Sequence, residues 1–481
     1  MMLAGKYQVV LFYCLVVSFA SISTALYYDY PLILGIPIVL AIVYFAIYHL
    51  DYLFEFVVLF TPISLNFEDL GDYGGIGFYM PTEPLLLGIT FLVIIRSLVN
   101  RRQDKAILSH PLSLALLFYL GWTFITCFMS SDIAVSLKFF MSKLWFIVPL
   151  FYFGTTYFQS TKKIKRFLRL YFFSLSIVVV YTMIRHGLNG FGEDQGHWVM
   201  TPFFKDHTSY GAVLALMFPV LIGMFVLAKD GAQKFILGSL VIVYLFGIYF
   251  SYTRAAYLSI VGAFVLYLLI RYRIRFKYVL TVVLCFAALL VVNKDTIWME
   301  LNKNKNEHAT EELGERIQSI SNVSSDASNL ERLNRWACAV EMFKERPVFG
   351  FGPGTYAFQY APFQHHEDIT IISTNFGDGG NAHSEYLGPL AESGLIGMLS
   401  FIVVVIAIFY TGIKLYYNLE DPWLKSVILV CVLGLFTYFT HGILNNYLDT
   451  DKASIPVWGF AAIIVATELR LKKGKLEKST A

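Results

Sequence analysis

Long apolar runs recur along nearly the whole chain of 481 residues. A bilayer core of ~30 Å needs about 20 apolar residues to cross it as a helix, and most of the runs approach this length. The apolar residues are continuous rather than alternating with polar ones, which favours helices over the strands of a membrane barrel. The candidate spans lie at 7–27, 31–49, 52–66, 83–99, 110–129, 136–158, 165–185, 209–228, 235–251, 255–270, 278–293, 394–416, 424–444 and 455–470.

This pattern predicts an all-α polytopic membrane protein, a bundle of about 12–14 transmembrane helices with a large helical loop. The composition agrees with that class, because 57% of the residues are hydrophobic, 15% are charged, and the mean hydropathy is +0.61. A soluble protein of this length would carry far more charge. The net charge of +3 indicates no nucleic-acid surface, so we expect membrane lipids and no nucleic acid as partners.

Basic residues collect in alternate connections between the spans, a pattern that marks the cytoplasmic side. Basic connections lie at 96–105, 161–169, 271–277 and 469–478, whereas 67–84 and 130–136 contain no Lys or Arg. The alternation predicts both termini in the cytoplasm and a large loop on the outer side. We therefore divide the chain into an N-terminal transmembrane bundle (1–293), the large outer loop (294–393) and C-terminal transmembrane helices with a basic cytoplasmic tail (394–481).

The large outer loop contains segments with different patterns. Its first part, 302–329, is polar throughout. The next part, 330–347, has apolar residues at the spacing of an amphipathic helix. A tight glycine-rich turn is predicted at 350–356, and a further short helix leading into the membrane is predicted at 381–392. Long structured loops in compact proteins are usually functional.

Ionisable residues stand at the outer edge of one span. His383, Glu385 and Glu392 lie directly before the apolar run 394–416. They could be interfacial polar groups that hydrogen-bond the start of a helix. Histidine also titrates near neutral pH, so His383 is a candidate general base. The residues by themselves leave both interpretations open.

Arg254 lies at the outer hairpin between two apolar runs, where the positive-inside pattern disfavours it. Burying an arginine in a membrane costs ~2.5 kcal/mol or more on insertion scales. Arg254 is therefore either a tolerated residue whose side chain reaches the interface or an anion-binding group. Lys138 and Lys143 fall near the same outer edge and are weaker candidates of the same kind.

Arg332 and Arg335 lie on the predicted amphipathic helix, where an exposed charged face would be an ordinary explanation. Planar arginine forks also suit the several charged oxygens of a diphosphate. Outer arginines and a histidine at a membrane edge fit a lipid-linked diphosphate sugar. His365 and His366 lack a helix-spaced histidine partner, so we expect no metal and no other cofactor.

Four stretches follow one another along the chain: FFKDHTSYGA (203–212), SYTRAAYLS around Arg254, ERLNRWACAVEMFKERPVFGFGPGTY around Arg332, and NAHSEYLGPLAESGLIG around His383. Together they resemble the motifs of the O-antigen ligase and O-antigen polymerase superfamily of bacterial membrane glycosyltransferases. The resemblance puts Arg254 at the hairpin arginine of the family, Arg332 at its loop arginine and His383 at its motif histidine. Ser384 stands where the family usually has asparagine, which bears on how the acceptor is held.

The resemblance implies transfer of a glycan from undecaprenyl diphosphate to an acceptor hydroxyl, on the periplasmic side of the bacterial inner membrane. Arg254 and Arg332 would hold the diphosphate and stabilise the charge that develops on it. His383 would orient or deprotonate the acceptor hydroxyl, and the anomeric carbon would be inverted without a metal. The remaining candidates for substrate binding are Arg335, Lys138, Lys143, Asp206, His207, Glu385, Tyr386 and Glu392.

The acceptor stays open at this point. A ligase passes the glycan to lipid A–core, whereas a polymerase passes it to another lipid-linked glycan; we expect the ligase reaction, with the polymerase as the alternative. A glycolipid flippase or transporter is a more distant alternative, because it would need charged residues along a path through the spans. Here the charged residues gather at the outer edge, and no internal repeat is visible.

Overall fold

The computed structural model describes residues 2–70, 77–100, 105–275, 327–364 and 380–480, with a few further positions between 277 and 293. Its helices are α1 (Met2–Tyr28), α2 (Gly35–Tyr48), α3 (Leu50–Phe60), α4 (Thr82–Asn100), α5 (Lys105–Leu108), α6 (Pro111–Cys127), α7 (Ile133–Ile147), α8 (Gly154–Tyr157), α9 (Thr161–Leu188), α10 (Glu193–Gly196), α11 (His207–Leu227), α12 (Gly231–Tyr249), α13 (Arg254–Arg271), α17 (Ala327–Glu345), α18 (Tyr356–Gln359), α19 (Leu387–Asn418), α20 (Pro422–His441) and α21 (Asp451–Thr480). Two short strands, β1 (Leu65–Asn66) and β2 (Tyr79–Met80), pair antiparallel. The predicted all-α polytopic membrane fold is confirmed.

Ten helical segments in the described part of the chain are long and apolar enough to cross a membrane. Two more apolar helices, α2 and α6, are shorter, with 14 and 17 residues. Counting them, the described residues reach the lower end of the predicted range. A π-helical turn at Val148–Phe153 joins α7 to α8 in one span. Pro149 lies in that turn and lacks the backbone N–H that a regular helix would need there.

One predicted span is wrong. The run 52–66 is not a single membrane helix, because α3 ends at Phe60 and a 3₁₀ turn at Thr61–Ile63 follows it. Pro62 lies in this turn and cannot donate a hydrogen bond to a continuing helix. The predicted span at 278–293 and most of the polar stretch at 302–329 lie outside the described residues.

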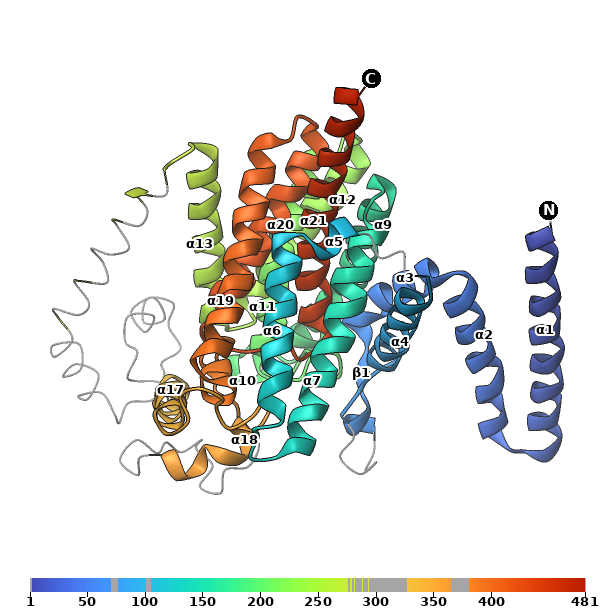
Figure 1. Cartoon of the computed structure of the whole chain (residues 1–481), viewed down its shortest axis with the longest axis horizontal. Coiled ribbons are helices and arrows are strands. Elements are labelled where there is room, and N and C mark those ends of the chain that lie inside the picture. The colour runs from blue at the N-terminus through green and yellow to red at the C-terminus, as the bar shows by residue number, and fades with distance from the viewer. Residues whose placement is uncertain are drawn as a thin grey trace.

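Helix α21 runs through the middle of the bundle, whereas α1 and α2 stand apart on one side (Figure 1). Every side chain of α21 from Asp451 to Ala466 is buried. A helix that is covered on all sides belongs to the core of a large bundle. The carboxylate of Asp451 accepts hydrogen bonds from the hydroxyls of Ser64 at 2.7 Å and Thr82 at 2.5 Å. The start of α21 therefore also anchors the connection between α3 and α4.

The basic helix ends meet at one end of the bundle. Arg470 of α21 donates to the hydroxyl of Thr161 at the start of α9 at 2.8 Å. The hydroxyl of Tyr417, near the end of α19, donates to the carbonyl of Ile270, near the end of α13, at 2.8 Å. In Figure 1 this is the end at which the C-terminus lies. Three of the four basic segments expected in the cytoplasm therefore begin or end here.

The described part of the large loop covers the opposite end of the bundle, where α17 and α18 lie (Figure 1). Helix α17 confirms the amphipathic helix predicted at 330–347, with slightly different ends. The predicted glycine-rich turn follows it, and Gly352 has a left-handed backbone with a φ of 112°. A Cβ atom on Gly352 would lie 1.9 Å from Ser130 Oγ, so this close approach to the loop before α7 requires glycine.

A kink in α19 contacts the residues between α17 and the glycine-rich turn. Gly394 is non-helical, with a φ of 69°, and separates a short first segment of α19 from its long membrane-spanning part. A Cβ atom on Gly394 would lie 2.1 Å from the carbonyl oxygen of Val348. The N–H of Leu395 donates to the carbonyl of Pro347 at 3.0 Å. The kink frees backbone groups of the helix, and the loop supplies their partners.

We expect the two ends of the bundle to lie on opposite sides of the membrane. The side chains of Lys344 on α17 and Lys472 on α21 are 62% and 58% exposed. In a variant whose native cysteines are replaced, Lys344→Cys should react with a membrane-impermeant maleimide added to the outer face of the intact membrane. Lys472→Cys should react only after the membrane is opened. Labelling of both positions from the same side would contradict this topology.

Candidate functional site

His383 lies in a short non-helical segment that leads into α19. Its backbone is left-handed, with a φ of 46°, which is uncommon for a residue with a side chain. The His383 N–H donates to Asn381 Oδ1 at 3.0 Å, and this bond supports the conformation. Ser384 Oγ accepts hydrogen bonds from the N–H groups of Tyr386 and Leu387, both at 3.3 Å, and so starts the helix. The short helix expected in this region begins only at Leu387.

Glu385 joins this segment to the loop between α20 and α21. Its Oε1 atom accepts hydrogen bonds from the Tyr438 hydroxyl at 2.6 Å and from the N–H groups of Tyr447 and Leu448 at 2.8 and 2.9 Å. Its own N–H donates to the carbonyl of Gly442 at 2.8 Å. Burial raises the pKa of Glu385, although these donors favour the charged carboxylate. The carboxylate predicted to bind substrate therefore has three donors within the protein.

Tyr386 and Glu392, two further candidates for substrate binding, also have partners within the protein. The Tyr386 hydroxyl donates to the carbonyl of Phe439 at 3.0 Å. Glu392 Oε1 accepts a hydrogen bond from the N–H of Tyr356, at the end of the glycine-rich turn, at 3.2 Å. These contacts hold α19 against α20 and α18. A contribution of either residue to substrate binding stays a prediction.

Arg335 is buried on α17 and has partners on several sides. Its Nε donates to Glu331 Oε1 at 2.6 Å, one turn earlier on the helix, and one Nη donates to the carbonyl of Asn381 at 3.2 Å. The guanidinium lies 5.1 Å from the ring centre of Tyr360. The Arg335 and Glu331 side chains are 7% and 5% exposed. This geometry favours a positioning role for Arg335, because its bond to Asn381 connects α17 to the segment that carries His383, and the ion pair with Glu331 holds the guanidinium in place.

Arg332 lies half-buried on the same helix, and its charge acts on the His383 imidazole. Burial is the largest cause that lowers the pKa of His383 to about 4, and the positive charges of Arg335 and Arg332 act in the same direction. The negative charges of Glu331 and Asp206 oppose this effect. The imidazole is therefore neutral at neutral pH, and it can accept a hydrogen bond or a proton.

Asp206 and His207 connect this region to the hairpin of Arg254. Asp206 caps the start of α11. His207 Nδ1 lies 2.8 Å from the carbonyl oxygen of Ser251, and the Thr253 hydroxyl donates to the His207 carbonyl at 3.0 Å. The hairpin that carries Arg254, the first residue of α13, is thereby fixed to the start of α11. We call the set formed by Arg254, Arg332, His383, Asp206 and His207 the loop-end cluster.

Sequence reasoning missed the loop between α20 and α21, which approaches this cluster. The Tyr447 hydroxyl contacts the hydroxyl of Thr208 in the first turn of α11. His441 Nε2 lies 3.0 Å from Asn445 Nδ2. The charge of Arg332 acts on both Tyr447 and His441. The polar break after the penultimate predicted span was the signal that could have indicated these residues.

Lys143, another candidate for substrate binding, lies near two carboxylates. Its charge acts on Glu385 and Asp449 and opposes the rise in pKa that burial causes in both. Asp449 was also missed, and the charge of Lys205 acts on it as well. Lys138 is exposed on the same helix as Lys143 and forms no ion pair with another residue that the structure describes.

The loop-end cluster combines anion-binding groups with a neutral imidazole. Arginines and the N-terminus of a helix such as α13 favour a bound anion. A neutral imidazole beside them can accept a proton from a hydroxyl group. Among the residues that the structure describes, no group of His, Cys, Asp and Glu side chains could hold a metal ion.

The family model described as O-antigen ligase matches residues 238–402, about a third of the chain. The match includes Arg254, Arg332 and His383, and it confirms the resemblance found in the sequence. The matched family implies glycosyltransferase-like enzymes and lipid-linked glycan substrates in general. A comparison with curated proteins finds none that matches the chain.

We expect Arg335→Ala to destabilise the loop. The substitution would leave Glu331 buried without its arginine, at a cost of ~3–5 kcal/mol. Limited proteolysis of the full-length protein should therefore cleave the loop of this variant faster than that of the wild type. The double variant Arg335→Met/Glu331→Gln removes both charges and should recover most of the resistance. If Arg335→Ala alone is as resistant as the wild type, the ion pair does not hold the loop.

Proposed function

We propose that this protein transfers a glycan from undecaprenyl diphosphate to an acceptor hydroxyl, on the periplasmic side of the bacterial inner membrane. The match to the O-antigen ligase family supports the reaction class. The observation that carries the proposal is the position of Arg332 on α17, which reaches the His383 segment through the bond from Arg335 to Asn381, so that the charge of Arg332 acts on the His383 imidazole. An anion-binding group and a proton acceptor are thus close together at one end of a membrane bundle.

The diphosphate of the donor would be held by Arg254 and Arg332. Guanidinium groups donate parallel hydrogen bonds to phosphate oxygens and keep their charge at any physiological pH. As the bond between the anomeric carbon and the phosphate oxygen breaks, negative charge grows on the diphosphate. Arginines fixed before the reaction stabilise that charge without having to reorganise.

His383 would act on the acceptor. The acceptor oxygen attacks the anomeric carbon from the face opposite the diphosphate, so a new carbon–oxygen bond forms as the bond to phosphate breaks. The configuration of the anomeric carbon is inverted. The proton of the acceptor hydroxyl passes to the imidazole of His383, and undecaprenyl diphosphate leaves.

The low pKa of His383 is consistent with proton transfer that occurs only after the donor has bound. Without substrate, burial and the two arginines of α17 keep the imidazole neutral but make it a weak base. A bound diphosphate would offset the positive charges and raise the pKa of His383. The imidazole then becomes a stronger proton acceptor once the donor is in place.

We propose lipid A–core as the acceptor, in agreement with the ligase description of the matched family. The alternative is a polymerase, which would use a second lipid-linked glycan as the acceptor. A strain that lacks the gene separates the two reactions. Loss of every surface repeat with accumulation of lipid-linked polymer indicates a ligase, whereas retention of a single surface repeat indicates a polymerase.

Arg254→Ala and Arg332→Ala should each lower transfer about 10²–10³-fold, as expected for loss of one charge-stabilising donor. Lysine at either position should recover little activity, because a point charge lacks the planar fork. The measurement is glycan transfer by the purified protein from a lipid-linked donor. Lys344→Ala is the matched control, since Lys344 is an exposed cation on the same helix as Arg332. Normal transfer by both arginine-to-alanine variants would contradict the assignment of Arg254 and Arg332 to the donor site.

The pH dependence of transfer should show two different pKa values for His383, one for the free protein and one for the protein with bound donor. Because its pKa without substrate is about 4, the imidazole is neutral above that pH, and kcat/KM should fall only as the pH approaches it. The fall in kcat should occur at a higher pH, since the bound diphosphate raises the pKa. His383→Gln keeps a hydrogen-bonding group but cannot take up the proton. Near-normal turnover of His383→Gln would rule out proton transfer to His383.

A further inference from the structure

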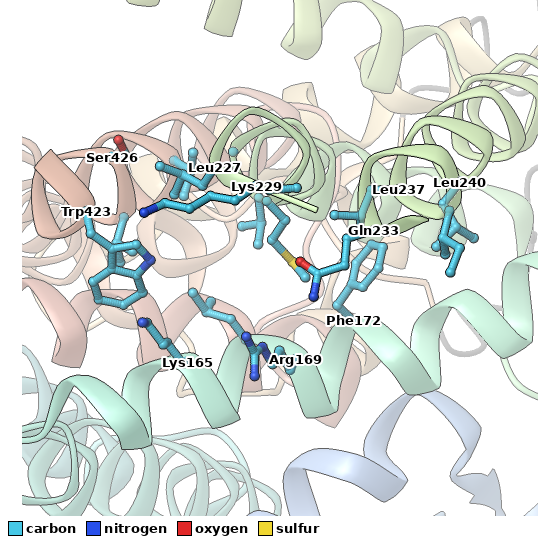
Figure 2. Close-up of a pocket in the computed structure, with 18 of the residues that line it drawn as sticks. Lys165, Arg169, Phe172, Leu227, Lys229, Gln233, Leu237, Leu240, Trp423 and Ser426 are labelled. Carbon is cyan, nitrogen blue, oxygen red and sulfur yellow. The ribbon is translucent and has the colours of Figure 1, made fainter. Parts of the chain in front are cut away.

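A cavity of about 1020 Å³ lies at the end of the bundle opposite the loop-end cluster. It is lined by α9, α11, α12 and α20, close to the ends of these helices. Figure 2 shows Lys165 and Arg169 on one side of the space and Lys229 and Gln233 on the other. None of these residues takes part in the proposed transfer reaction.

The rim of this cavity carries three cations. Lys165 lies 4.7 Å from the ring centre of Trp423, and Arg169 and Lys229 are exposed. Within the part of the chain that the structure describes, none of the three forms an ion pair. The single carboxylate among the lining residues, Asp421, already caps the start of α20 with its side chain. The rim is therefore suited to an anion.

Below the rim, the walls are mostly apolar and reach into the bundle. Phe172 lies 11 residues after the start of α9, and Leu240 lies 9 residues after the start of α12. At 1.5 Å per residue, these side chains lie roughly 14–17 Å from the helix starts. One leaflet of a bilayer core of ~30 Å has about the same depth. Measured from the helix starts, the cavity thus has about the depth of one leaflet, with Lys165 and Lys229 near the helix ends, Arg169 further along α9, and apolar side chains beyond them.

We propose that this cavity binds an anionic phospholipid from the leaflet on this side of the membrane. The phosphate would lie between Lys165, Arg169 and Lys229, and one acyl chain would enter the slot past Phe172 and Leu240. Trp423 at the rim suits the interface between headgroups and acyl chains. The bound lipid would connect α9 to α12 and α20 at their ends.

The charge and the shape together determine which ligand fits. A zwitterionic lipid would add a further cation to a rim that already has three, so an anionic headgroup is favoured. A small water-soluble phosphate would satisfy the rim and leave the apolar slot without an occupant. Cationic clefts between the cytoplasmic ends of transmembrane helices are typical sites for anionic headgroups.

Native mass spectrometry of the purified full-length protein tests the proposal, with dioleoyl phosphatidylglycerol and dioleoyl phosphatidylcholine as probes. The two lipids have the same chains and differ in net charge. We expect phosphatidylglycerol to bind about tenfold more tightly or better, at about 1 kcal/mol for each basic residue near the headgroup. The preference should be lost in Lys165→Ala/Arg169→Ala and reduced in Lys229→Ala. Lys162→Ala, an exposed lysine on α9 outside the cavity lining, should keep it.

Thermal unfolding without added lipid shows whether each variant is folded. If the double variant is unfolded, the lipid preference of Lys229→Ala tests the proposal instead. Equal binding of the two lipids by the wild type would overturn the proposal, and so would an unchanged preference in the folded variants. Displacement of phosphatidylglycerol by an equal concentration of glycerol 3-phosphate would also overturn it. In that case the site would recognise a phosphate without the lipid chains.

Discussion

The buried carboxylate of Glu385 is the interaction on which the loop end of the bundle depends. It accepts three hydrogen bonds from the end of α20 and the loop after it, so the segment that carries His383 is fixed against the bundle. Leaving such a carboxylate without its donors would cost far more than an exposed hydrogen bond, because no water can replace them. A second anchor reaches the same segment from α17, where Arg335 binds both Glu331 and the carbonyl of Asn381.

The electrostatics of the loop-end cluster follow from these two anchors. They bring the charge of Arg332 to the His383 imidazole, whose burial already favours the neutral form. All of the charged groups involved lie at helix ends or in loops, where the cost of placing a charge in a membrane protein is lowest. A lipid-linked diphosphate has an apolar tail and a polar glycan, so the bond that reacts must lie at the same boundary. The proposed function therefore agrees with the position of the arginines at the boundary between the membrane and water.

Local signals made most of the fold predictable. Apolar length indicated the spans, and the spacing of apolar residues indicated α17, because both depend only on neighbouring residues. The exception at 52–66 shows the limit of apolar length, since Pro62 ends the helix within an apolar run. The family motifs placed Arg254, Arg332 and His383 in one matched region.

The sequence did not predict which residues of the candidate site have partners within the protein. Motifs group residues that are neighbours along the chain, whereas the partners of Glu385 and Tyr386 come from α20 and the loop after it, more than 50 residues away. The same holds for Arg335, whose contact with Asn381 spans 46 residues. Asp449 was missed because only the packed helices bring it near Lys143.

The most direct test of this account is an experimental structure of the protein in a lipid nanodisc with undecaprenyl diphosphate bound. We expect the diphosphate to contact the guanidinium groups of Arg254 and Arg332, with the imidazole of His383 beside the phosphate that would carry the glycan. A diphosphate that contacts neither arginine, for example one bound at the cationic rim of the opposite cavity, would contradict the account.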